Sequence, residues 1–193
     1  MRIATQMSVD EWAALDEDEP GELVDGELQE EEMAGVAHEV IVGFLIEMFR
    51  RWIVSRGGVV GGSEIKFVVA PRTGRKPDVA VFFPGQLPPP DGPVRTPPDI
   101  MVEVVTPTAR DSRRDRVSKP DDYARFGVRF YWIVDPGLRS VEIFELLADG
   151  RYARAVAVTE GLIAAVPGCE GLSVDVDALW AEIDRLGPPE PAE

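Results

Sequence analysis

Two short runs of the chain, PDVAVFF (77–83) and DIMVEVV (99–105), are almost uninterruptedly apolar. A strand with one face in water alternates apolar and polar residues, whereas a strand covered on both faces is apolar throughout. These two segments are therefore expected to be central strands of a sheet with other elements packed on both faces. This layering favours the α/β fold class, with a mixed sheet flanked by helices.

Each of these strands carries a carboxylate. Asp78 stands at the beginning of the first strand, and Glu103 in the second strand shares a face with Met101 and Val105. Burying an ionised carboxylate without a partner is strongly unfavourable, so Glu103 is expected to be paired, protonated or bound to a metal ion. Two carboxylates on adjacent strands suit Mg²⁺ or Mn²⁺, and such a site favours metal-assisted hydrolysis of phosphodiesters.

The competing interpretation of both carboxylates is a buried ion pair with a basic side chain. The basic residues that could take this role are Arg72, Arg75, Lys76 and Arg110. In that case the two acids would stabilise the fold and carry no chemistry.

Capping, turn and periodicity signals predict the remaining elements. Ser8 predicts the cap of a short helix that runs to about Leu15, and Asp25-Gly26 predicts a hairpin. Apolar spacing predicts helices at 36–53, 120–126 and 174–186, the second ended by Gly127. Further strands are expected at 64–69, 130–134, 141–146 and 154–158. The proline-rich segment 84–98 is expected to be a surface loop outside the core.

Length and composition favour a single domain. The chain has 193 residues, of which 45% are hydrophobic, so it can bury one core but not two large ones. We expect one domain over residues 1–186, with 1–32 as an N-terminal helix and hairpin appendage and 187–193 as a disordered tail. No long apolar stretch predicts a membrane span, and the single cysteine, Cys169, fits a reducing cytoplasm.

The charge distribution limits how the chain could contact nucleic acid. A formal net charge of -15 argues against coating a polyanion through overall electrostatics. The segment 110–129 is the basic exception, and Arg110, Arg113 and Arg114 are the candidates for phosphate contacts. The alternative is a solvated helix face with internal arginine–aspartate pairs.

Several motifs together resemble a known family. They are PDVAVF, the run DIMVEVVTPTARDSRRDRVSKPDDYARFGVRFYWIVDP, EWAAL and ELVDGEL near the start, and PGCEGLSVDVDALW near the end. This pattern resembles the Uma-type restriction endonucleases of bacteria, members of the PD-(D/E)XK nuclease superfamily, over nearly the whole chain. The resemblance implies a restriction-endonuclease-like core and Mg²⁺-dependent (or Mn²⁺-dependent) cleavage of DNA.

Carried over to this chain, the resemblance assigns roles to individual residues. Asp78 corresponds to the first metal-binding acid and Glu103 to the second. The superfamily has a lysine two residues after the second acid, where this chain has Val105. The resemblance instead implies a lysine of the following helix, Lys119, with Tyr123 one turn further along.

Several of these assignments have an equally simple structural interpretation. Pro120 is expected to place Lys119 just before the first helical turn, and Lys119 could also be a solvated surface lysine. Glu27 and His38 match positions that the family keeps, but they could also be a hairpin residue and a core histidine. Glu39 is the other candidate for an N-terminal helix acid that completes the metal site.

The expected function is therefore a metal-dependent endonuclease acting on DNA. A homodimer or higher homo-oligomer is expected on geometric grounds, because cutting both strands of a duplex needs two sites. Two rival hypotheses are a non-catalytic module that keeps the nuclease fold and binds nucleic acid, and a purely structural homo-oligomer.

Overall fold

The computed structural model describes residues 6–15, 21–29, 34–106 and 114–187. The helices are α1 (Val9–Ala13), α2 (Val36–Ile53), α4 (Lys119–Phe126) and α5 (Val176–Asp184), with a 3₁₀ turn η1 (Val54–Arg56) and a π-helical turn η2 (Arg114–Ser118). The strands are β1 (Glu22–Val24), β2 (Glu27–Gln29), β3 (Val59–Gly62), β4 (Phe67–Ala70), β5 (Thr73–Arg75), β6 (Val79–Phe82), β7 (Ile100–Val104), β8 (Phe130–Asp135), β9 (Ser140–Leu146), β10 (Tyr152–Val158), β11 (Leu162–Ile163) and β12 (Val174–Asp175).

The core is built on one large mixed sheet. Within the described ranges this sheet has six strands in the order β10-β9-β8-β7-β6-β3. β7 and β8 run parallel, with Glu103 beside Ile133, and α4 lies on the connection between them. The other neighbouring strands are antiparallel. The two apolar runs that carry Asp78 and Glu103 are thus adjacent strands at the centre of the sheet, as expected from their composition.

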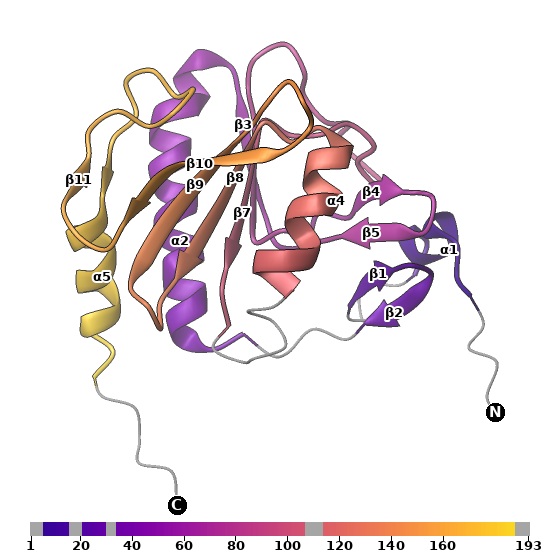
Figure 1. The fold of residues 1–193 in the computed structure, drawn as a ribbon, viewed down its shortest axis with the longest axis horizontal. Helices are drawn as coiled ribbons and strands as arrows, with labels where there is room; N and C mark the ends of the chain where they lie inside the picture. Colours follow the sequence, from indigo (N-terminus) through magenta and orange to yellow (C-terminus); the bar gives the residue numbers. More distant parts are fainter. Residues whose placement is uncertain (1–5, 16–20, 30–33, 107–113, 188–193) are drawn as a thin grey trace, which may run out of the picture.

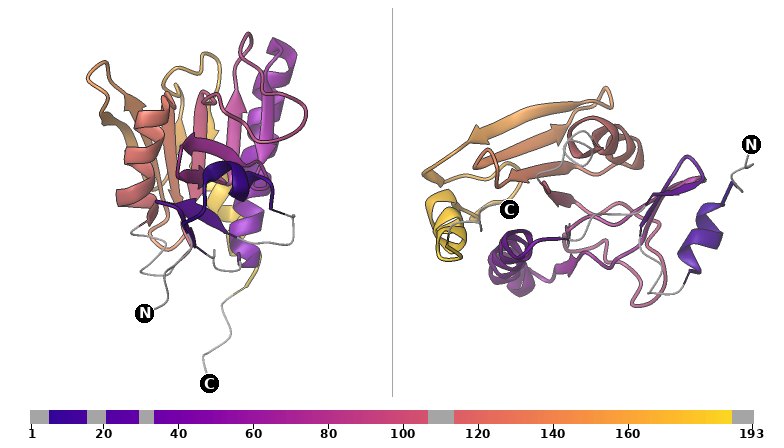
Figure 2. Two further views of the ribbon diagram at one scale, coloured as in Figure 1. Left: turned by 90° about the vertical axis from the view of Figure 1, so that its right-hand side faces the viewer. Right: turned by 90° about the horizontal axis from the view of Figure 1, so that it is seen from below.

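Each face of the large sheet is covered by a different layer. One face packs Val79, Val102 and Trp132 against residues of α2 and α5. The opposite face packs Met101 and Tyr131 against Tyr123 of α4. Figure 2, seen from below, shows α2 and α5 on one side of the strands and α4 on the other. This two-sided burial explains why the central strands are apolar throughout.

A smaller sheet lies beside α4 and joins the beginning of the chain to its middle. In the described residues it has four strands in the order β2-β1-β5-β4, and Figure 1 shows it next to α1. The hairpin predicted at Asp25-Gly26 is confirmed as β1 and β2, which pair antiparallel. β1 also pairs with β5 through Leu23 and Gly74. The hairpin is therefore continuous with strands that directly precede Asp78.

We expect Gly74→Ala to lower the free energy of unfolding by about 1–3 kcal/mol, the usual effect of overpacking. A Cβ atom at Gly74 would lie 2.2 Å from the ring of Trp12, which is 1% exposed. Urea unfolding of the purified variant measures the change. Gly43→Ala is the matched control, because a Cβ atom at this exposed position of α2 would meet no neighbouring side chain within 4 Å. The control should gain stability, since alanine is the better helix former.

Most predicted elements are confirmed, including α2 with the expected bounds and the Ser8 capping box of α1. Gly127 ends α4 in the left-handed conformation at φ 97°. The predicted final helix begins later, at Val176, because Asp175 caps its first turn through the backbone N–H of Ala178. The strand predicted at 64–69 is shifted to Phe67–Ala70. The short strands β3 and β5 were not predicted, because glycines hide their pattern.

The expectation that segment 84–98 stays outside the core was wrong at Val94. This side chain is 3% exposed and belongs to the hydrophobic cluster on the face of the large sheet that α4 covers. Its backbone N–H donates to Lys66, and its carbonyl accepts from Val68. The loop thus adds a short parallel bridge to β4, a contact between distant segments that local composition does not encode. Among the described residues, no helix has the length and apolar character needed to cross a bilayer.

Candidate active site

Asp78 directly precedes β6, and Glu103 lies near the end of the neighbouring strand β7. Val79 pairs with Val102 in the antiparallel register, and these two residues are the chain neighbours of Asp78 and Glu103. Asp78 is also tied to the second strand, because its Oδ2 accepts a hydrogen bond of 2.7 Å from the Val104 backbone N–H. The two carboxylates therefore share one end of the sheet.

The carboxylate of Glu103 is held by two side chains of α4. Lys119 Nζ donates to Oε2 at 2.7 Å, and the Tyr123 hydroxyl donates to Oε1 at 2.5 Å. Glu103 and Lys119 are 2% and 4% exposed. Burial and the charge of Glu103 raise the pKa of Tyr123 well above its usual value, so the phenol stays protonated and remains a donor. Residues 119 and 123 lie one helical turn apart, which is why both reach the same carboxylate.

The position of Lys119 differs from the one expected from Pro120. Lys119 is the first residue of α4 and follows the π-helical turn η2 directly, so it lies within a continuous helical segment. Pro120 occupies the second position of α4, in its first turn, where proline is tolerated. The expectation that Lys119 precedes the first turn was wrong, because η2 supplies helical backbone before it.

Behind Lys119 lies a buried ionic cluster made of Glu22, Arg75 and Asp122. Arg75 donates to Glu22 at 2.8 Å and to Asp122 at 2.5 and 3.1 Å. Glu22 lies 3.7 Å from Lys119 Nζ, and both Glu22 and Arg75 are fully buried. Burial raises the pKa of Glu22, but Lys119 and Arg75 outweigh it and hold the pKa below its ordinary value. Glu22 therefore stays ionised and, through Arg75, links β1 to the first turn of α4.

Glu22 and Arg75 were not predicted as members of this cluster. The sequence suggests Arg75 as an ion-pair partner of Asp78 or Glu103, but its hydrogen bonds go to Glu22 and Asp122. The sequence also points to Glu27 of the same hairpin. Glu27 lies exposed on β2 opposite Val24 and is not brought to Glu103. The burial of Glu22 follows from the pairing of β1 with β5, across about fifty residues of sequence.

His38 lies at the beginning of α2 and contacts the other carboxylate. Its Nε2 is 3.3 Å from Asp78 Oδ1, and its Nδ1 is 3.3 Å from Glu39 Oε1. The imidazole is 12% exposed, whereas the Glu39 side chain is 62% exposed. Burial lowers the pKa of His38, but the hydrogen bond and charge of Asp78, with Glu39, outweigh it and raise the pKa above 6.5. His38 therefore orients Asp78, and Glu39 contacts only the far side of the ring.

The raised pKa of His38 predicts a simple titration. The chain has one histidine, so its ring proton gives a single assignable NMR signal. We expect a midpoint above 6.5 in the wild type and a lower one in Asp78→Asn, because burial alone lowers the pKa. A group with a raised pKa stabilises the fold below its unfolded pKa and loses that contribution as the pH rises through the folded value. An unchanged midpoint in Asp78→Asn would contradict the contact.

The remaining candidates fall in or next to the basic segment. Arg110 and Arg113 lie outside the described residues, as does the side chain of Arg114. Arg116, further along, donates to Asp135 at 2.9 Å and is also paired with Glu142. Arg116 thus pairs with acids of β8 and β9, outside its own segment, rather than with the internal aspartates of the alternative interpretation.

Asp78 and Glu103 match the type and number of protein ligands that a hard divalent cation commonly binds. Mg²⁺ commonly binds one or two protein carboxylates and completes its shell with waters and phosphate oxygens. Asp78 and Glu103 are such a pair of carboxylates. Among residues 6–15, 21–29, 34–106 and 114–187, no group of three or more histidine, cysteine, aspartate or glutamate side chains is placed to hold a metal ion.

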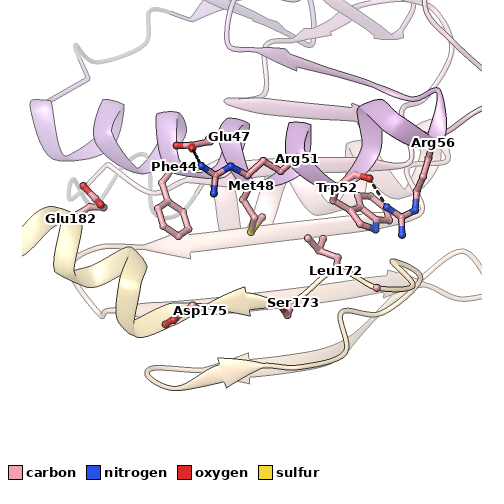
Figure 3. A pocket seen from close by; sticks show the side chains of 11 residues that line it. Phe44, Glu47, Met48, Arg51, Trp52, Arg56, Leu172, Ser173, Asp175 and Glu182 are labelled. Atoms are coloured by element: carbon pink, nitrogen blue, oxygen red, sulfur yellow. Dashed lines mark hydrogen bonds and ion pairs between the residues drawn. The ribbon is translucent and has the colours of Figure 1, made fainter.

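A larger groove lies on the other side of the molecule, between α2 and the segment before α5. It has a volume of about 600 Å³, and Figure 3 shows Phe44, Met48 and Leu172 lining it. Its polar groups have structural partners. Glu47 pairs with Arg51, and Asp175 caps α5. The groove shares no residue with the Asp78–Glu103 pair, so we place the candidate active site on the α4 side.

Comparisons with known proteins agree with this fold. The family described as "Uma2: Putative restriction endonuclease" matches residues 9–177. A crystal structure described as "a putative nuclease belonging to DUF820", from Anabaena variabilis, aligns with a TM-score of 0.73 at 17% identity. The alignment covers 92% of this chain and 99% of that one. A search of curated proteins finds no significant match.

The family match and the fold therefore define a restriction-endonuclease-like α/β protein. The chain belongs to the family described as "Uma2: Putative restriction endonuclease", as its sequence motifs indicated.

Proposed function

We propose that this chain is an endonuclease that hydrolyses phosphodiester bonds in DNA with Mg²⁺ or Mn²⁺, which Asp78 and Glu103 hold. The observation that carries the proposal is the position of Glu103. It is a buried carboxylate on the strand next to the one that Asp78 begins, with the ammonium group of Lys119 2.7 Å away. Functional sites commonly bring buried acids and a basic group together in this way.

Each described side chain has a role in this proposal. The metal ion, when bound, would activate an attacking water and neutralise charge on the scissile phosphate. The positive charge of Lys119 beside Glu103 would stabilise negative charge on the phosphate oxygens. Tyr123 fixes the Glu103 carboxylate, and His38 fixes that of Asp78. Arg110, Arg113 and Arg114 are proposed to contact flanking phosphates, and a homodimer would bring one site to each strand.

One observation favours a second candidate function. Both oxygens of Glu103 already accept hydrogen bonds from Lys119 and Tyr123. The buried charge is thus balanced without a metal ion, as it would be in a module that keeps the nuclease fold and binds nucleic acid without cutting it. In this candidate Asp78 has a structural role, through its contacts with the Val104 N–H and His38.

Incubation with supercoiled plasmid tests the two candidates. The nuclease proposal expects nicked or linear DNA with Mg²⁺ or Mn²⁺ and intact plasmid when EDTA is present. Retarded but uncut plasmid with every metal would replace the proposal with the binding module. Cleavage that persists in EDTA would overturn the metal-dependent mechanism.

A further inference from the structure

A second pocket lies on the same face of the large sheet as Glu103, between α4 and strands β8 to β10. It has a volume of about 390 Å³, within the range of small-molecule sites, about 300–1,000 Å³. Its walls include Ala124 of α4, Ile133 of β8, and three aromatic side chains, Tyr131, Phe144 and Tyr152. We call it the Tyr131 pocket. It shares neither Asp78 nor Glu103, and the proposed hydrolysis does not use it.

The Tyr131 pocket adjoins the candidate active site. Ile133 pairs with Glu103 in the parallel register of β7 and β8, so the two side chains are direct neighbours on one face. Neighbouring strands lie about 4.8 Å apart. The ring of Tyr131 also contacts that of Tyr123, with centroids 5.3 Å apart. The distance from Glu103 to the pocket is therefore no longer than a nucleotide. The base of a nucleotide can occupy the pocket while its phosphate lies at Glu103.

The aromatic side chains form a rigid wall for a flat ligand. Phe144 stacks on Tyr131 with centroids 6.3 Å apart and an interplanar angle of 30°. Tyr152 lies 5.9 Å from Tyr131, and its hydroxyl donates to the Val128 carbonyl at 2.7 Å, which fixes the ring. Tyr131 is fully buried, whereas Phe144 and Tyr152 are half-buried and present ring surface to the pocket.

Charged side chains of both signs also line the pocket. They are Arg151, whose side chain is 81% exposed, Arg116 and Asp121. Both guanidinium groups are shared with acids, Arg151 with Asp149 at 2.6 Å. A flat aromatic body with an attached phosphate suits such a pocket, because the rings stack on the body and an arginine meets the phosphate.

We infer that the Tyr131 pocket binds one unpaired nucleobase of the DNA strand, next to the phosphate at Glu103. This inference rests on the proposed function and names its substrate class more closely. A base enters such a pocket only when it is unstacked, so the protein should prefer single-stranded or locally opened DNA to a closed duplex.

Anisotropy titrations of two fluorescein-labelled single-stranded pentadeoxynucleotides test the inference. One carries bases and the other carries abasic sites at every position, and EDTA prevents hydrolysis. The base-carrying strand should bind the wild type at least about fivefold more tightly, the lower end of what one base stacked on an aromatic side chain contributes. Equal affinity for the two strands, or binding of neither, would overturn the inference.

Two variants locate the effect. Ala124→Leu fills the pocket with a good helix former and should weaken binding of the base-carrying strand alone. Phe144→Ala removes one stacking wall and should do the same. Ala181→Leu, at an exposed alanine of α5, is the matched control and should leave both affinities unchanged. If Ala124→Leu binds both strands with the wild-type affinities, or loses affinity for both equally, the base is bound at another place on the protein.

Plasmid hydrolysis is a separate readout. Metal-dependent cleavage without a base-dependent affinity would overturn the pocket and leave the nuclease proposal standing. Base-dependent affinity without cleavage by any metal would overturn the nuclease proposal and retain the pocket in a binding module.

Discussion

Asp78→Asn should lower the rate of plasmid cleavage by about a hundredfold or more, as expected when one preorganised charge is lost from a site. The substitution keeps the shape of the side chain, and an amide oxygen can still accept from the Val104 N–H that now donates to Oδ2. What it removes is the negative charge of Asp78. The measurement is the rate of plasmid nicking at saturating Mn²⁺.

Controls separate this effect from unfolding. Asp78 is partly solvated, at 15% side-chain exposure, so the asparagine variant should unfold within about 1 kcal/mol of the wild type. Glu47→Gln is the matched carboxylate control, with a side chain that is 63% exposed on the far side of α2. It should cleave at the wild-type rate. Equal cleavage by Asp78→Asn and the wild type would remove Asp78 from the mechanism.

Arg75→Met should lower the free energy of unfolding by about 3–5 kcal/mol, the usual effect of breaking a buried ion pair. The methionine fills similar space but leaves Glu22 without its closest guanidinium partner in a fully buried position. It also releases Asp122, and with it the first turn of α4 that carries Lys119. Urea unfolding measures the loss.

A double variant distinguishes the lost ion pair from lost packing. Glu22→Gln combined with Arg75→Met removes both charges and should recover part of the stability that Arg75→Met loses. Arg51→Met, at a pair with 79% and 63% exposed side chains, should change stability by less than about 1 kcal/mol. If the double variant is less stable than the sum of the single effects predicts, the ion pair is not the cause.

The pH dependence of this cluster has a defined sign. The pKa of Glu22 is held below its ordinary value of 4.5. A carboxyl group with a depressed pKa stabilises the fold above its unfolded pKa and loses that contribution as the pH falls through the folded value. The stability advantage of the wild type over the double variant should therefore shrink on acidification below about pH 4.5, near the unfolded pKa of glutamate.

The sequence by itself determined the central strands and the long helices. Continuous apolar runs identified β6 and β7, because burial on both faces excludes polar residues from nearly all positions of a strand. Asp78 and Glu103 stood out as the carboxylates in these two runs. Helical spacing and caps identified α2 and α4. These signals are local: each depends on residues within a few turns or one strand length of each other.

Only the tertiary structure decided that Glu22, and not Glu27, lies beside Lys119. Glu22 is indistinguishable from Glu27 by local pattern, yet one is fully buried and the other is exposed, because β1 pairs with β5. Lys119 reaches Glu103 because η2 sets the start of α4. Short strands such as β5 form because they pair with neighbouring strands, not because their residues have a high intrinsic β-propensity. The physical reason is that ion pairing and strand pairing join residues distant in sequence, and their free energy appears only once the chain has brought them together.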